Sequence, residues 1–546
     1  MTIYLDYAAT TPVDPRVAAV MAECLADPSA QGNAASATHG PGFAAQERVE
    51  RARAEVAALI GAEPREIIFT SGATEANNLA LLGVARAARR AGAGHAGRAE
   101  ARAHVVSART EHKSVLDACR QLEKDGFALT LVEPDETGRV PPEAIQTALR
   151  ADTLLVSLML ANNEIGVVND IATVAQLATK RGVLLHSDAS QAVGKLPVDV
   201  RQLGVDFLSL TAHKFYGPKG IGALYVREAA RPRIAALHFG GGHERGLRPG
   251  TLPTHQVVGM GVAAALAHEQ GARDAAHARD LAERLARELA TIPGVRFNDR
   301  HAEGVPGLVN ASFDGVEGES LVTGLPEIAV STGSACSSAS REASYVLRAL
   351  GRSVELAQSS LRLSLGRFST AAEVDAAATA IQGEVARLRA IAGDEAVQPR
   401  IQRPINPDSS LATGNTLLGR SLNPLARRYF LAQPRPPVAA AHVPRAELHS
   451  GRAGREADGT AVRFELEIAS GTVKSARFTA YGCPHTVALV AWLCETLEGT
   501  RIGDPLPGGP IDWAEKFAVP AEKLGRLLIV EDALRAVMDN ARQGSK

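Results

Sequence analysis

A lysine next to a histidine and a small hydroxyl residue follows an apolar run near the middle of the chain. Residues 209–220, SLTAHKFYGPKG, place Thr211 and His213 beside Lys214. A lysine that forms a Schiff base with an aldehyde needs a partly desolvated amine of lowered pKa, which the end of a buried strand can provide. Thr211 and His213 carry groups that bind phosphate. Taken alone, the segment fits a solvated lysine at a strand end better, so it needs support from elsewhere.

Two segments upstream supply that support. Asp188 lies in residues 186–191, HSDASQ, directly after an apolar run, and residues 70–75, TSGATE, join a strand end to a helix start. An acid at the carboxyl end of a central strand can keep a pyridine nitrogen protonated, which makes the ring of pyridoxal phosphate an electron sink. Unpaired backbone N–H groups at a helix start bind phosphate. The three segments together predict a pyridoxal phosphate site.

Short apolar runs that alternate with helical stretches must position these residues. The expected strands are residues 66–70, 103–107, 153–157, 182–186 and 205–210, and the expected helices include 43–60 and 171–181. This alternation predicts an α/β fold with a mostly parallel sheet covered by helices on both faces. An amphipathic helix over 273–291 leads into a second, smaller α/β unit. We expect a large domain over about 15–260 and a small domain over about 261–395 that includes the N-terminus.

Composition excludes several classes of function. The 546 residues carry 59 Lys and Arg against 60 Asp and Glu, a formal net charge of −1, which gives no electrostatic reason to expect nucleic acid as a partner. No apolar run has the ~18–20 residues of a membrane span. The first residues lack the basic and apolar regions of an export signal. Five widely spaced cysteines favour a reducing compartment, so we expect a cytoplasmic protein without a membrane partner.

The composition changes after about residue 395. Eight prolines, seven arginines and a single acid, Asp408, lie between Gln398 and Arg445, so residues 396–446 are predicted to be a linker with one short helical piece near 423–430. A small domain is expected over 447–546. It begins with a hairpin of residues 462–468 and 472–478, followed by a helix over 484–498.

Eight motifs occur in one order over residues 2–390. They are residues 4–12, 70–75, 110–112, 162–166, 186–191, 213–214, 238–245 and 331–336. Together they resemble the cysteine desulfurases of iron–sulfur cluster assembly, the IscS/NifS type, which belong to class V of the fold-type I pyridoxal phosphate enzymes. The resemblance implies L-cysteine as substrate, a homodimer, and a sulfur acceptor such as an iron–sulfur scaffold protein.

The resemblance also implies a role for each matching residue. Lys214 resembles the Schiff-base lysine, Asp188 the partner of the pyridine nitrogen, and His112 the histidine that stacks on the ring and can move protons. The implied contacts to the phenolic oxygen are Asn163 and Gln191, and those to the phosphate are Ala73, Thr74, Thr211, His213 and, from the other subunit, Thr251. Arg362 matches the arginine that pairs with the substrate carboxylate. Asn163 is also expected to bind the substrate.

Cys336 is the expected nucleophile. It lies in residues 331–340, STGSACSSAS, which are almost all small, so the segment is predicted to pack little. A thiol that attacks substrate sulfur and then delivers it needs such freedom, and it must react as the thiolate. The alternative, a buried structural cysteine, is disfavoured by the small neighbours. Cys24 and Cys119 lie in helical patterns and are expected to be packing residues.

The C-terminal residues resemble a different family. Residues 476–483, ARFTAYGC, and 531–534, EDAL, are similar to iron–sulfur scaffold proteins of the IscU/NifU type, which use three cysteines with an aspartate and a histidine. Here Cys483 matches one cysteine, whereas Asp458 and Arg526 fall at the other two positions. We therefore expect a small α+β scaffold-like domain with an incomplete ligand set and no bound metal. Cys483, at a helix start that favours a thiolate, is a candidate for sulfur transfer or partial iron–sulfur ligation.

The sequence thus predicts a cysteine desulfurase that forms L-alanine and a persulfide on Cys336, and that supplies sulfur for iron–sulfur clusters or other thio-cofactors. Two alternatives remain. A selenocysteine lyase uses the same residues, and a noncatalytic assembly platform would use this part only for docking. The intact set of Lys214, Asp188, His112 and Cys336 argues against the platform.

Overall fold

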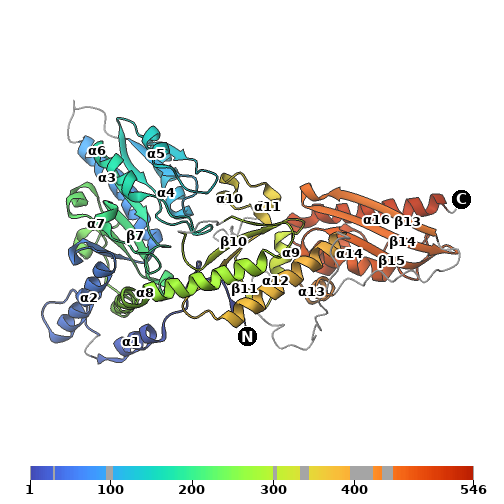
Figure 1. Ribbon diagram of the computed structural model, residues 1–546, viewed down its shortest axis with the longest axis horizontal. Helices are drawn as coiled ribbons and strands as arrows, with labels where there is room; N and C mark the ends of the chain where they lie inside the picture. The colour runs from blue at the N-terminus through green and yellow to red at the C-terminus, as the bar shows by residue number, and fades with distance from the viewer. Residues whose placement is uncertain are drawn as a thin grey trace.

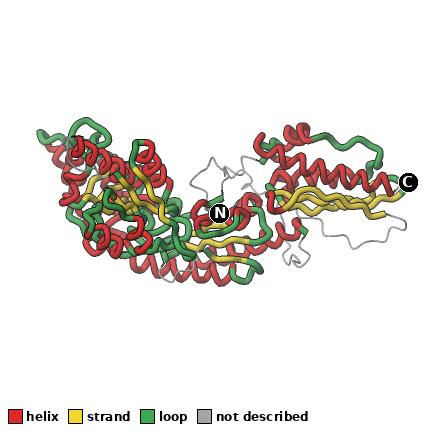
Figure 2. Tube along the Cα trace, turned by 90° about the horizontal axis from the view of Figure 1, so that it is seen from above, coloured by secondary structure: helices red, strands yellow, loops and turns green. Residues whose placement is uncertain are grey.

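The computed structural model describes residues 2–28, 31–93, 103–298, 304–331, 343–393, 422–432 and 447–544. The molecule is elongated, with a helix-covered sheet at one end and the C-terminal sheet-and-helix unit at the other, while the N-terminus lies near the middle (Figures 1 and 2). None of the helices in these ranges has the length and hydropathy needed to cross a bilayer.

A seven-stranded sheet forms the centre of the large domain (Figure 1). In spatial order its strands are β2 (Ile67–Thr70), β8 (Gly222–Val226), β7 (Phe207–Thr211), β6 (Leu184–Asp188), β5 (Thr153–Ser157), β3 (His104–Ala108) and β4 (Ala128–Val132). Strand β8 runs antiparallel to both of its neighbours, and the other pairs are parallel. The predicted mostly parallel sheet is confirmed, with strand bounds within two residues of those expected.

Helices cover both faces of this sheet, and each face has its own apolar cluster. One face is covered by α2 (Gly40–Leu59), α5 (Pro142–Ala148), α6 (Ile171–Lys180), α7 (Val200–Leu203) and α8 (Thr254–Leu289), with α1 (Pro15–Ala26) against α8. The other face is covered by α3 (Ala73–Ala93) and α4 (Lys113–Lys124). Because both faces are covered, six of the seven strands consist entirely of buried residues.

The 36-residue helix α8 connects the large and small domains. It begins at Thr254, nineteen residues before the helix that the sequence predicts. The small domain contains an antiparallel sheet of β9 (Val295–Phe297), β10 (Leu308–Phe313) and β12 (Ser360–Ser364), and a parallel pair of β1 (Ile3–Tyr4) and β11 (Ile328–Ala329). Its helices are α9 (Gly318–Thr323), α10 (Tyr345–Ala349), α11 (Val354–Gln358) and α12 (Ala371–Ala392). The N-terminus therefore belongs to the small domain's sheets.

The C-terminal unit packs helices onto one three-stranded antiparallel sheet (Figure 2). Its elements are β13 (Glu447–Arg455), β14 (Thr460–Ala469), β15 (Thr472–Tyr481), α14 (Pro484–Leu497), α15 (Pro510–Phe517) and α16 (Leu524–Gly544). The predicted hairpin and helix are confirmed as β14, β15 and α14. Strand β13 was not predicted, because its residues ELHSGRAGR carry no apolar alternation.

A short helix, α13 (Pro424–Leu431), lies where the sequence predicts a helical piece within the linker. Phe430 and Ala426 on this helix are fully buried, and α13 packs against α14. This part of the predicted linker thus contributes to the core of the C-terminal unit. Short 3-10 turns complete the described chain at η2 (Pro64–Glu66), η3 (Ala212–Lys214), η4 (Glu228–Arg233), η5 (Glu244–Gly246), η7 (Glu456–Asp458) and η8 (Ala521–Lys523).

Candidate active site

Asp188 and Lys214 lie at the carboxyl ends of the adjacent parallel strands β6 and β7. The two strands pair so that Asp188 stands opposite Ser209, and Lys214 ends the turn η3 that follows β7. Asp188 is buried, and its carboxylate accepts hydrogen bonds from Asn77 Nδ2 at 2.7 Å and from the Ser190 N–H at 2.9 Å. Ligands in open α/β sheets bind at this edge, so the structure brings the predicted acid and amine to one site.

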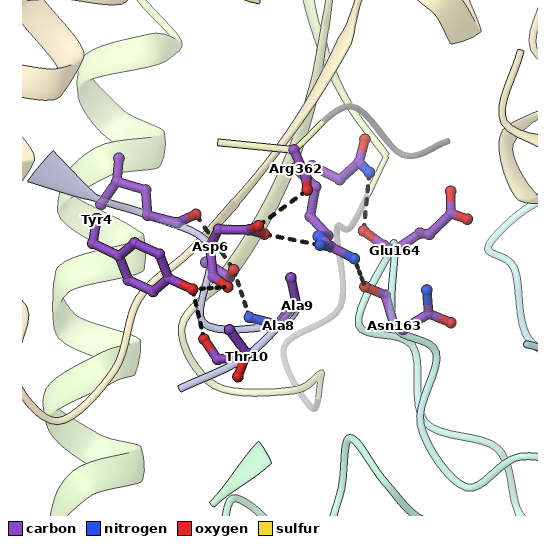
Figure 3. Close-up of polar contacts among 12 residues, drawn as sticks. Tyr4, Asp6, Ala8, Ala9, Thr10, Asn163, Glu164 and Arg362 are labelled. Carbon is purple, nitrogen blue, oxygen red and sulfur yellow. Dashed lines mark hydrogen bonds and ion pairs between the residues drawn. The ribbon is translucent and has the colours of Figure 1, made fainter. Parts of the chain in front are cut away.

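The N-terminal segment supplies the acceptors for the lysine. Lys214 Nζ donates to the backbone oxygens of Ala8 at 2.5 Å and Ala9 at 2.8 Å. The Tyr4 hydroxyl donates to the Thr10 carbonyl at 2.7 Å, which closes this segment into a compact turn (Figure 3). Residues 4–12 form one of the motifs in the sequence, but only the structure shows that they form a wall of the site.

The start of helix α3 can bind an anion. Gly72 has a φ of 156°, and α3 begins at Ala73, so the N–H groups of Ala73 and Thr74 have no acceptor within the helix. A Cβ added to Gly72 would lie 3.7 Å from Thr211 Oγ1, which places Thr211 against this turn. Backbone N–H groups, a hydroxyl and the positive end of the helix dipole together suit a phosphate.

His213 extends the same wall of the site. Its Nδ1 lies 3.2 Å from Thr10 Oγ1. Burial, followed by the charges of Lys214 and Lys219, lowers the pKa of His213 to about 4. The imidazole is therefore neutral near pH 7, when it can offer a single N–H to an anion.

His112 caps the start of α4 with its ring. Its Nδ1 accepts a hydrogen bond from the Ser114 N–H at 3.1 Å and lies 2.8 Å from the Ser114 hydroxyl. Because a backbone N–H can only donate, Nδ1 carries no proton, and the proton of the neutral ring is on Nε2. Burial lowers the pKa of this imidazole, which favours that neutral form.

Arg362 connects the small domain to the site (Figure 3). It lies in the middle of β12, its side chain is 3% exposed, Nη2 contacts Asp6 Oδ1 at 2.9 Å, and Nη1 donates to the Asn163 carbonyl at 3.0 Å. Arg362 Nε and Asn163 Oδ1 are buried and have no hydrogen-bond partner among the described residues. A buried guanidinium with an unused N–H can receive a carboxylate.

Glu164 follows Asn163 and is buried beside the same arginine. Its carboxyl accepts from the Ser344 hydroxyl at 2.5 Å, and burial raises its pKa to about 7. Its backbone carbonyl accepts from Asn310 Nδ2 at 2.9 Å, so the loop after β5 is tied to β10 in the small domain.

The remaining predicted residues have different positions. Gln191 is buried, and its Nε2 donates to the same Ala8 carbonyl that Lys214 contacts, at 2.8 Å. Thr251 is exposed just before α8. Cys336 lies outside the described residues. Ser331, the last described residue before it, is bridged to Arg362 and donates to Asp6 Oδ2 at 3.2 Å.

Sequence reasoning missed two polar partners. Asn77, which holds Asp188, lies one helical turn after Ala73 on α3, so helical spacing was the available signal. Lys195, four residues after Gln191, places Nζ 2.7 Å from Gln191 Oε1. The loop it occupies gives no periodicity from which this contact could be predicted.

In the C-terminal unit, Cys483 is the N-cap of α14, as predicted, and is only 1% exposed. Its Sγ lies 3.4 Å from the Thr486 hydroxyl. Arg526 Nη1 lies 3.8 Å from Glu317 Oε1 of the small domain. In the described ranges, no three His, Cys, Asp or Glu side chains are grouped to hold a metal ion.

Comparisons with known proteins identify the family of this chain. The family described as "Aminotransferase class-V" matches residues 3–377. The chain is 54% identical over 389 residues to "Cysteine desulfurase IscS" of Aeromonas salmonicida, covering 71% of this chain and 94% of that protein. It is 52% identical over 389 residues to the protein of the same name from Pseudomonas entomophila, with the same coverage.

The chain is also similar to solved structures. A "NIFS-LIKE PROTEIN" has a TM-score of 0.63 and 34% identity, and the alignment covers 70% of this chain and 98% of that one. DndA from Streptomyces lividans has a TM-score of 0.54 and 39% identity, covering 66% and 99%. The chain therefore belongs to the class-V aminotransferase family and, within it, to the pyridoxal-phosphate-dependent cysteine desulfurases.

Proposed function

We propose that residues 1–395 convert L-cysteine to L-alanine and leave the sulfur on Cys336 as a persulfide, for iron–sulfur clusters or other thio-cofactors. Atoms and electrons balance in the overall reaction, because L-cysteine and the protein thiol become L-alanine and a protein S–SH group. The observation that carries the proposal is the placement of Asp188 and Lys214 at the ends of adjacent strands, in a site that also contains an arginine with an unused N–H.

The residues present fit pyridoxal phosphate. Asp188 is a buried acid for the pyridine nitrogen, and Lys214 is the amine for the aldehyde. Ala73, Thr74, Thr211 and His213 would hold the phosphate, while Asn163 and Gln191 would face the phenolic oxygen. The buried Oδ1 of Asn163 has no partner among the described residues, which is costly unless a ligand supplies one. When bound, this cofactor supplies an electron sink for the substrate's carbanion.

Three residues of the chain then bind the substrate, transfer a proton and attack the sulfur. Arg362 holds the substrate carboxylate through Nε, because Nη1 and Nη2 already contact Asn163 and Asp6. His112 holds one exchangeable proton at Nε2, from which it can exchange protons with the reacting atoms. Cys336, as a thiolate, attacks the substrate sulfur, and the electron pair of the broken C–S bond stays with the carbon, which a proton then completes to a methyl group.

Two measurements on the full chain test the activity. Purified protein should show the visible absorbance of lysine-bound pyridoxal phosphate, and Lys214→Ala should lose it. Sulfide and alanine should be released from L-cysteine in equal amounts when a reductant is present. A colourless wild type in excess cofactor would overturn the proposal, and faster turnover of selenocysteine than of cysteine would favour the lyase.

The active form is proposed to be a homodimer. Thr251 matches a phosphate contact given across a subunit interface, and here it is exposed next to the start of α8. A monomer would leave this hydroxyl in water and one phosphate contact unmade.

For the C-terminal part we propose a scaffold-like domain over 447–546 that receives no standard cluster, joined through a linker over 396–446. Its three antiparallel strands followed by helices, and Cys483 at the first helix start, support the resemblance. The ligand set is incomplete. The position of a further cysteine is taken by Arg526, and a guanidinium there repels iron.

This domain is docked rather than free. Lys523, only 1% exposed, contacts Glu319 of α9 at 2.5 Å, and the Ser320 hydroxyl donates to the Gly482 carbonyl at 2.8 Å. Helix α12 packs against β15, and both units contribute to one apolar cluster. We therefore propose that the domain acts in cis on sulfur transfer from a fixed position.

The test is Cys483→Ser in the full chain. It should leave sulfide release from cysteine unchanged and alter only sulfur transfer to an added acceptor. Truncation near residue 397 is a weaker test, because it would expose the face of α12 that β15 covers. Cys24→Ser is a matched control, since that thiol is also buried but lies on α1. A stoichiometric iron–sulfur cluster in the purified C-terminal domain would overturn this reading.

A further inference from the structure

Lys195 lies in the loop after β6, four residues beyond Gln191. Its amine donates to Gln191 Oε1 at 2.7 Å. The other end of the same amide, Nε2, donates to the Ala8 carbonyl at 2.8 Å, and Lys214 Nζ contacts that carbonyl at 2.5 Å. Lys195, Gln191, Ala8 and Lys214 therefore form one continuous hydrogen-bonded chain that ends at the reactive amine.

The chemistry of the two neighbours fixes the orientation of the amide. A glutamine side chain can turn over, which exchanges its donor and acceptor ends. Here Oε1 accepts from the Lys195 amine, and Nε2 faces a carbonyl, which can only accept. The flipped amide would set its oxygen against the Ala8 carbonyl and lose that hydrogen bond. Of the two hydrogens on Gln191 Nε2, the Ala8 carbonyl accepts one.

Lys195 also adds charge at this point of the site. The groups that act on its amine are Lys214, from η3, and Arg362, from β12, and Lys195 acts in turn on His213. Burial, followed by these two cations, lowers the pKa of Lys195 to about 7. Its charge is therefore sensitive to small changes in its neighbours near neutral pH.

We infer that Lys195 is a positioning residue for the reaction, which holds the Gln191 amide with its N–H toward the cofactor site and places a positive charge beside Lys214. The inference rests on the proposed function of this site, because it assigns Gln191 to the cofactor. Lys195 itself touches neither substrate nor cofactor and acts through Gln191.

The experiment compares Lys195→Met with Lys195→Arg in the full-length protein. The methionine removes donor and charge at similar length, whereas the arginine keeps both. The first readout is the dissociation constant of pyridoxal phosphate. We expect Lys195→Met to weaken binding roughly tenfold, which is the loss of one buried hydrogen bond to a charged group. Lys195→Arg should restore binding to within about threefold of wild type, and Lys180→Met, at an exposed lysine on α6, should not change it.

The second readout separates positioning from packing. The protonation midpoint of the lysine-bound cofactor, read from its visible absorbance against pH, should rise by about one unit in Lys195→Met, because a neighbouring positive charge disfavours the protonated form. A purely structural lysine would change the melting temperature and leave this midpoint in place.

A double-mutant cycle completes the test. If Lys195 acts through Gln191, then Lys195→Met should weaken binding little further in a Gln191→Leu background. Additive losses, or an unchanged midpoint and affinity in Lys195→Met, would overturn the inference while the wild-type cofactor site stands. A wild type that fails to bind pyridoxal phosphate at Lys214 would instead overturn the proposed function.

Discussion

Arg362 and Asn163 each contain a buried polar atom without a partner in the described structure, and such atoms destabilise a fold by about 1–3 kcal/mol. The two residues are in contact through the hydrogen bond from Arg362 Nη1 to the Asn163 carbonyl, so the two unpartnered atoms indicate a ligand site at this contact. We therefore expect Arg362 to discriminate a carboxylate from a neutral group, because its Nε–H is unused among the described residues.

Replacing Arg362 by lysine should raise the KM for cysteine by about 10–100-fold, because an ammonium cannot keep the Asp6 contact and also meet a carboxylate in the same plane. The cofactor absorbance should remain. Steady-state kinetics on the holoenzyme measure the KM. An unchanged KM would show that the carboxylate binds elsewhere.

Replacing Cys336 by alanine should abolish sulfide release while the cofactor spectrum still changes on addition of cysteine, because only the sulfur acceptor is missing. The control is Cys119→Ala, whose thiol is buried on α4 with a pKa that burial raises to about 12, so it is not a nucleophile at neutral pH. Sulfide release at the wild-type rate from Cys336→Ala would show that another group attacks the sulfur.

Close packing removes the amphipathic sequence pattern from the first half of helix α8. Its first half is rich in alanine and glycine and buried on several sides, so it lacks the amphipathic period of residues 273–291. A Cβ on Gly261 would lie 2.6 Å from both Cα and Cβ of Ala52 on α2. Gly261 therefore permits the close approach of α8 and α2, although the glycine content of this part of α8 argues against a helix.

Gly261→Ala should destabilise the large domain by about 1–3 kcal/mol, because overpacking against the α2 backbone exceeds the gain in helix propensity. Gly383→Ala in α12 is the matched control, since its added Cβ meets nothing within 4 Å and should stabilise by about 0.5–1 kcal/mol. Urea unfolding followed by circular dichroism measures both. Equal effects of the two substitutions would contradict the packing argument.

Asp188 and Lys214 could be predicted from the sequence because a strand end and a side-chain type are both local features. The acceptors of Lys214, at Ala8 and Ala9, and the partner of Gln191, at Lys195, could not, because they depend on how distant segments meet. The same reason explains β13, whose glycine-containing strand is specified by pairing with β14 rather than by its own pattern.

At the scale of the molecule, the small domain and the C-terminal unit share one apolar cluster. Charged groups lie at its edge: Glu317 and Glu319 from α9 face Lys523 and Arg526. Burial, with the charge of Glu319, raises the pKa of Glu317 above its ordinary 4.5. The contact between the units should therefore depend on pH.

The Glu317 carboxyl binds its proton more tightly in the folded protein than in the unfolded chain, so protonation of this group stabilises the fold. This contribution to the free energy of unfolding is fully present below pH 4.5, and it is lost as the pH rises from there through the raised pKa of the folded state. Glu317→Gln should remove this loss, so its unfolding free energy should exceed that of wild type increasingly from pH 5 to pH 7. Exposed Glu327→Gln is the control. Parallel pH curves for Glu317→Gln and wild type would contradict the assignment.

Subunit complementation tests the dimer. Thr251→Val and Lys214→Ala each damage every site of their own homodimers, but a mixed dimer contains one site with both native residues. Co-expression in equal amounts should restore tight, lysine-bound cofactor in about a quarter of the sites, as random pairing requires. No restoration would show that each protomer builds its site alone.

The parallel pairing of β1 with β11, and the hydrogen bond from the Ala8 N–H to Ser364 Oγ at 2.8 Å, have a consequence for biosynthesis. Residues 3–8 leave the ribosome long before their partners, which are made more than 320 positions later. At about 5–20 residues per second, Ser364 is added roughly 20–70 s after Ala8. Until then the carbonyls that receive Lys214 have no fixed place. Cofactor loading is therefore expected late in translation or after release.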